Sequence, residues 1–181
     1  MSELDEAWAA ELAKAEARAR MAGRADISEY LALRGSNDLL RSTGSSWLLT
    51  LFMTVAAEAN RDGAAIQISR QDAHRFKMDH ANMLGPRLVL ESGIRKITVE
   101  VGWPRTPRDG FIRGGGLASG NINHMGMKYV SQQLRLILSP LGSPQWIAYA
   151  KSGQHGELHE ADVRRHVSIL LDDKRYPRKH S

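Results

Sequence analysis

The stretch RKITVEVGW, residues 95–103, has the clearest pattern in the chain. Apolar residues at 97, 99, 101 and 103 alternate with polar or small residues at 96, 98, 100 and 102. Strict alternation is typical of a strand with one face against a core and the other toward water. The pattern therefore predicts that Val99 and Val101 are buried and that Thr98 and Glu100 are more exposed.

A turn-rich tip follows this strand. Pro104, Pro107 and the Asp109-Gly110 pair have the turn chemistry that ends regular structure. Phe111, Ile112 and Arg113 then return as a short partner strand. We expect a hairpin made of 95–103 and 111–113, with a stiff projecting tip between them.

Helical patterns precede the hairpin. Residues 47–57 are apolar on nearly all sides, which predicts a buried helix ending at Asn60–Gly63. A short strand over 64–68 follows. The pattern Ser69-Arg70-Gln71-Asp72 then indicates the start of a helix over about 70–77. A further helix lies within 80–92, either starting at Pro86 after a loop or kinked there.

The order of these elements resembles a winged helix-turn-helix DNA-binding domain over residues 46–118. The stretches AEANRDGAAIQISRQDAHRF (57–76) and LVLESGIRKITVEV (88–101) carry the resemblance. In that family the first stretch spans the end of helix one, a short strand and helix two. The second stretch ends the recognition helix before the wing. The resemblance implies an α+β fold with a β-hairpin wing and binding to duplex DNA.

The distribution of charge favours the same function. The 181 residues hold 25 Lys and Arg against 20 Asp and Glu, a net charge of +5. Residues 61–115 hold ten of the cations, and residues 110–154 contain no acidic residue. Lys and Arg contacts to phosphates supply most of the sequence-independent affinity for nucleic acid. The predicted nucleic-acid-binding residues are Arg70, Arg75, Lys77, His80, Asn82, Arg87, Arg95, Lys96, Arg105, Arg108 and Arg113.

An enzyme or small-anion-binding protein is the alternative function. The glycine-rich segment 113–124 carries Arg113, Ser119, Asn121 and His124, and we expect it to be a loop. Glycines let backbone N–H groups approach an anion, and a histidine can act as acid or base. Neither a phosphate-binding fingerprint nor a nucleophile elbow is present, and the chain has no cysteine. The sequence thus favours binding without catalysis and indicates no cofactor.

Histidines offer one further test of metal binding. His159, Asp162 and His166 lie on one stripe of a helix predicted over 157–172. Their residue types and spacing are compatible with zinc. Val163 and Leu170 share that stripe, so a packing role is favoured and no metal site is predicted.

The ends of the chain complete the predicted organisation. Residues 3–22 form an amphipathic helix that docks on the surface or joins a homodimer, and short helices lie within 27–42. We expect a helix up to about 133, then a hairpin of strands 134–138 and 146–150. The segments are 1–45, 46–118 and 119–181, unless all form one domain. The acidic N-terminus and the absence of a long apolar run favour a cytoplasmic protein without membrane contact.

Overall fold

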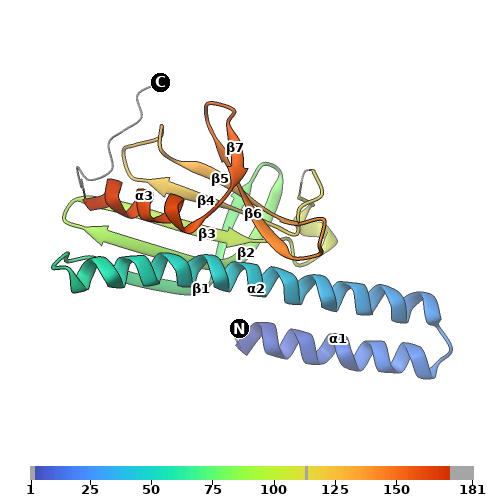
Figure 1. Cartoon of the computed structure of the whole chain (residues 1–181). Helices are drawn as coiled ribbons and strands as arrows, with labels where there is room; N and C mark the ends of the chain where they lie inside the picture. Colours follow the sequence, from blue (N-terminus) through green and yellow to red (C-terminus); the bar gives the residue numbers. More distant parts are fainter. Residues whose placement is uncertain (1–2, 113, 172–181) are drawn as a thin grey trace.

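The computed structural model describes residues 3–112 and 114–171. Within them, seven strands form one antiparallel sheet in which strand order equals chain order (Figure 1). The strands are β1 (Gln67–Met78), β2 (Ala81–Ser92), β3 (Arg95–Gly102), β4 (Ala118–His124), β5 (Gln132–Leu138), β6 (Pro144–Ala150) and β7 (His155–Glu157). The mixed α+β class predicted from the sequence is confirmed.

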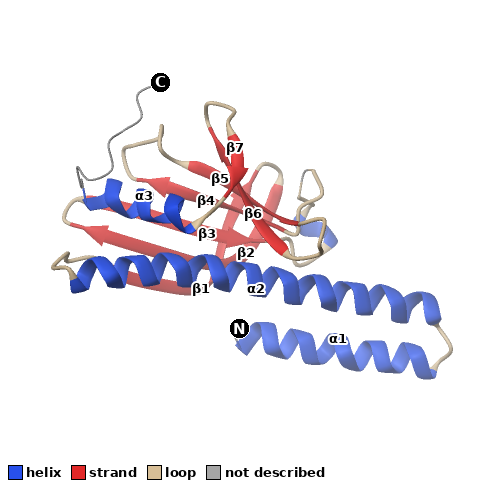
Figure 2. Cartoon of the chain, viewed as in Figure 1, coloured by secondary structure: helices blue, strands red, loops and turns tan. Residues whose placement is uncertain are grey.

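Helices cover one face of the sheet. The described residues contain α1 (Glu3–Met21), α2 (Ala25–Arg61), α3 (Glu160–Leu171) and a short 3-10 helix, η1 (Pro107–Asp109). Leu48, Leu49 and Phe52 of α2 share a core with the sheet and with Val163 and Val167 of α3. The first half of α2 extends past the sheet and runs beside α1 (Figures 1 and 2). The molecule is therefore a helix-backed sheet with a projecting helical hairpin.

The alternation in β3 is confirmed. Val99 and Val101 are completely buried, whereas Thr98 and Glu100 are half-buried. Val99 lies between Leu88 of β2 and Ile122 of β4 in the strand register. The odd positions of β3 therefore face the helices, and the even positions face the opposite, uncovered side of the sheet.

The helices predicted over 70–77 and within 80–92 are wrong, because both segments are strands of the β1–β2 hairpin. Asp72, expected to complete a capping box with Ser69, instead forms an ion pair along β1, with Arg70 Nε 2.7 Å from Asp72 Oδ1. Pro86 fits β2 because the ladder is broken opposite it, between Gln71 and His74. A bulge of this kind tolerates a residue that has no N–H to donate.

Other expectations had mixed outcomes. The hairpin of 95–103 with 111–113 is wrong, because β3 pairs with β2 on one side and β4 on the other. The separate helices expected on either side of Gly44 are one continuous helix, α2. The helix expected up to about 133 is replaced by the beginning of β5. The β5–β6 hairpin, the N-terminal helix and the C-terminal helix are confirmed.

Two glycines explain how tightly the middle strands pack. A Cβ placed on Gly85 would lie 2.2 Å from the carbonyl oxygen of Val101, and one on Gly120 would lie 2.4 Å from that of Glu100. Neither gap admits a side chain. These positions let β2 and β4 approach β3 where its chain leaves the sheet toward Trp103.

Candidate functional site

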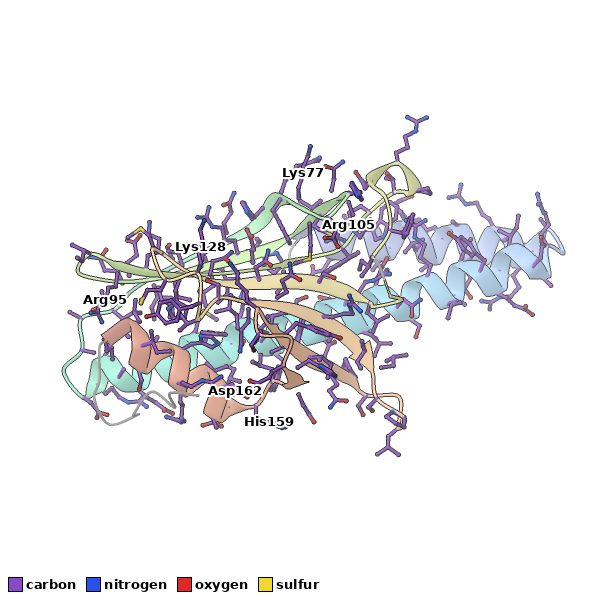
Figure 3. All side chains as sticks on the ribbon, turned by 90° about the horizontal axis from the view of Figure 1, so that it is seen from above. Lys77, Arg95, Arg105, Lys128, His159 and Asp162 are labelled. Carbon is purple, nitrogen blue, oxygen red and sulfur yellow. The ribbon has the colours of Figure 1, made fainter. Side chains whose placement is uncertain are left out.

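Four of the predicted cations converge on one hollow at the end of the sheet. We name it the basic hollow; its volume is about 750 Å³. Arg75 and Lys77 reach it from β1, and Arg105 and Arg108 reach it from the segment after β3. Figure 3 shows Lys77 and Arg105 near each other, on the side of the sheet from which the α1–α2 hairpin projects. The other lining residues are Phe76, Asn82, Met83, Leu84, Thr106 and Asp109.

Local structure explains why these side chains meet. The β1–β2 hairpin turns at Asp79 and His80, so Lys77 and Asn82 form a cross-strand pair beside the turn. Leu84 forms an isolated antiparallel bridge with Trp103, which holds the end of β3 against the hairpin. The segment 104–109 therefore leaves the sheet directly beside β1 and β2.

The basic hollow has an excess of positive charge. Among the described residues that line it, Asp109 is the one carboxylate. Its Oδ2 accepts hydrogen bonds from Thr106 Oγ1 at 2.8 Å and from Thr106 N at 2.9 Å. These bonds hold the pKa of Asp109 below its ordinary value. Asp109 thus stays ionised and orders η1, while the four cations leave the hollow with a net positive charge.

A second hollow adjoins the first. It lies between the α1–α2 hairpin and the segment 103–116, has a volume of about 390 Å³, and is named here the aromatic pocket. Arg105 and Thr106 line both hollows. Four aromatic residues line the aromatic pocket: Trp8, Tyr30, Trp103 and Phe111. Its polar lining consists of Arg34, Asn37, Asp38, Arg41, Arg105 and Thr106.

Guanidinium groups stack on aromatic rings in this pocket. Arg105 Cζ lies 4.0 Å from the ring centroid of Trp103, and Arg34 Cζ lies 5.1 Å from that of Trp8. Arg34 Nη2 also donates to the carbonyl oxygen of Arg105 at 2.9 Å. The helical hairpin and the loop are therefore tied together at the boundary between the two hollows.

Asp38, the one acidic side chain among the described residues of the aromatic pocket, already accepts hydrogen bonds within the chain. Asp38 accepts from Arg41 Nη1 at 2.7 Å and from Trp8 Nε1 at 3.1 Å. Arg41 Nε donates to the carbonyl oxygen of Leu117 at 2.7 Å. Three arginines against one paired carboxylate leave the pocket with a net positive charge as well.

The structure separates the remaining predicted cations from these hollows. Lys96 Nζ lies 2.6 Å from Glu91 Oε1, and Arg70 forms an ion pair with Asp72. Arg95 pairs with Ser92 at the end of β2 that is remote from the Lys77–Asn82 pair, and Figure 3 shows it far from Lys77. Arg87 faces Glu100 in the middle of the β2–β3 ladder. His80 is exposed in the β1–β2 turn, and Arg113 lies outside the described residues.

Sequence reasoning missed the contribution of α2. Tyr30, Arg34, Asn37 and Arg41 follow each other at spacings of four, three and four residues, and all line the aromatic pocket. This spacing places side chains on one face of a helix. A polar and aromatic stripe on the expected helices was the signal that could have identified them.

The alternative site predicted in 113–124 is not assembled. Residues 118–124 form β4 and not a loop. Ser119 and Asn121 lie on the side of the sheet opposite the helices, where Ser119 is nevertheless buried, whereas His124 faces the helices, because adjacent side chains of a strand alternate. Asn121 Nδ2 donates to Glu100 Oε1 at 3.2 Å, and His74 Nε2 lies 3.1 Å from Glu100 Oε2. Both oxygens of Glu100 are thereby used to bridge β1, β3 and β4.

His124 forms a buried pair with His166 of α3. His124 Nε2 lies 2.9 Å from His166 Nδ1, and His166 Nε2 lies 3.1 Å from Gln132 Oε1. The carbonyl oxygen of Gln132 can only accept, so His166 donates from Nε2 and accepts at Nδ1 from His124. His124 Nδ1 then carries a lone pair, and it has no hydrogen-bond partner among the described residues.

Burial keeps both rings neutral. Desolvation lowers the pKa of His124 to about 4. Desolvation, His124 and Arg165 together lower the pKa of His166 to about 3. His159 and Asp162 do not join His166: Asp162 accepts from the backbone N–H of His159, and the His159 side chain is exposed. No cluster of metal-ligand type occurs within 3–112 and 114–171.

No family model, curated protein or solved structure matches the chain. The sheet-dominated core does not confirm the winged-helix arrangement. None of the helices in the described part of the chain has the length and apolar character needed to cross a membrane.

Proposed function

We propose that this protein binds nucleic acid through the basic hollow. The observation that carries the proposal is the convergence of Arg75 and Lys77 with Arg105 and Arg108 from a separate segment. Cations grouped in a hollow whose one described carboxylate is already hydrogen-bonded attract a phosphate backbone. Arg34, which lines the adjoining aromatic pocket, adds a further positive charge beside the hollow.

Removing two of these cations tests the proposal. Arg105→Ala combined with Arg108→Ala is expected to weaken binding to an oligonucleotide and to reduce the salt slope of log K by up to about two units. Arg75→Ala with Lys77→Ala is expected to act in the same way, because both pairs line the same hollow. Fluorescence anisotropy at two or more salt concentrations measures affinity and slope together.

A matched control removes the same charge elsewhere. Arg70→Ala with Lys96→Ala also deletes two cations, but their partners are Asp72 and Glu91 and neither cation lines the basic hollow. We expect this variant to bind nearly as well as the unmodified chain. Equal weakening by the control, or no binding of the unmodified chain at low salt, would contradict the proposal.

A further inference from the structure

We propose that the aromatic pocket takes an unpaired base, so that the protein selects single-stranded over duplex nucleic acid. This inference rests on the proposed function, because the basic hollow supplies the contacts to the phosphates. Its occupant is a nucleotide of the same strand whose backbone lies in the basic hollow. Two features of the pocket support this assignment.

Continuity between the two hollows is the first feature. Arg105 and Thr106 belong to both linings, so a strand in the basic hollow passes directly over the mouth of the aromatic pocket. A volume of about 390 Å³ lies within the range of small-molecule sites, roughly 300–1,000 Å³. A single base with its sugar is a ligand of this size class.

The rim of the pocket is the second feature. Phe111 is 80% exposed and Tyr30 is 59% exposed, although both line the pocket. Exposed aromatic rings beside arginines provide stacking surfaces that accept any base, because every base has a π-face. Large apolar side chains left in water at the edge of a charged recess are typical of a binding surface.

The pocket geometry disfavours a duplex at this site. In a duplex the bases are stacked inside the helix, and a base must be extruded before it can enter a recess. An oligothymidylate can place its phosphates in the basic hollow and one base in the aromatic pocket. A duplex of equal length can place only its phosphates in the basic hollow.

The test compares three probes on the full chain by anisotropy. We expect a short oligothymidylate to bind at least tenfold more tightly than a duplex of equal length or an abasic strand that keeps its phosphates. Tyr30→Ala with Phe111→Ala is expected to weaken oligothymidylate binding about 5- to 100-fold, the range for loss of base stacking. Its salt slope should not change, because no cation is removed.

Tyr129→Ala serves as the control, since Tyr129 is an exposed aromatic residue that is absent from both linings. It should leave all three affinities unchanged. If the abasic strand or the duplex binds as tightly as oligothymidylate, and Arg105→Ala with Arg108→Ala still weakens binding, the pocket inference is overturned while nucleic-acid binding stands. Absence of binding to every probe at low salt overturns both.

Discussion

Lowering the pH from 7 to 4 is expected to reduce the free energy of unfolding by about 3 kcal/mol through His124 alone. Its pKa is about 4 in the folded chain against an ordinary value of 6.5, and each pKa unit corresponds to about 1.4 kcal/mol. Between these values the unfolded chain binds a proton that the folded chain does not. Stability therefore falls as the pH drops through this window.

The hydrogen bonding of the buried His124–His166 pair explains this loss of stability. A proton added to His124 Nδ1 would create a buried charge and an N–H with no acceptor among the described residues. His166 extends the loss of stability toward pH 3, because its pKa is lowered further than that of His124. Denaturant unfolding at a series of pH values, followed by tryptophan fluorescence, measures the effect.

Two variants identify the source of this pH dependence. His124→Leu with His166→Leu is expected to flatten stability between pH 6.5 and 4, whatever the stability of the variant at pH 7. His159→Ala removes an exposed histidine just before α3, outside the buried pair, and should leave the slope nearly unchanged. A double variant that retains the original slope would show that other groups cause it.

Val99→Asp is expected to destabilise the chain by about 4 kcal/mol or more, because it places a carboxylate in the core without a partner. Val99 is completely buried between Leu88 and Ile122. Thr98→Asp puts the same charge on the uncovered side of the sheet and should cost less than about 1 kcal/mol. For a chain of this size the difference corresponds to roughly 10 °C in melting temperature. Equal melting temperatures would refute the assignment of faces in β3.

The fold could be predicted only where local pattern and burial agree. β3 is buried on one face and shows clean alternation, so its strand was evident from the sequence. β1 is a sheet edge whose first seven side chains are exposed, so no apolar alternation marks it. Its Ser-x-x-Asp spacing matches a helix start equally well. In β2, Pro86 predicted an interruption of regular structure. The bulge that accommodates this proline lies in β1, so the sequence around Pro86 does not reveal it.

The candidate site was predictable in its charges and not in its shape. The eleven residues predicted from the sequence included Arg75, Lys77, Arg105 and Arg108, because cations in one segment are visible without a fold. That they share a hollow depends on the β1–β2 hairpin, which the sequence did not predict. The aromatic pocket depends on α1 packing beside α2, a contact between helices whose partner surfaces carry no specific motif.

The order of the strands also shapes the route by which the chain folds. Each ladder joins neighbours in sequence, so every strand pairing closes a short loop at low entropic cost. The hydrogen bond from Trp146 Nε1 to the carbonyl oxygen of Gly44, at 2.8 Å, joins residues 102 apart, so we expect it to form after those loops. Trp146→Phe is therefore expected to speed unfolding and leave the folding rate nearly unchanged, which stopped-flow kinetics can measure. If Trp146→Phe instead slows folding, α2 docks on the sheet before or during the rate-limiting step of folding. We expect α2 to dock last, on a sheet that assembles strand by strand.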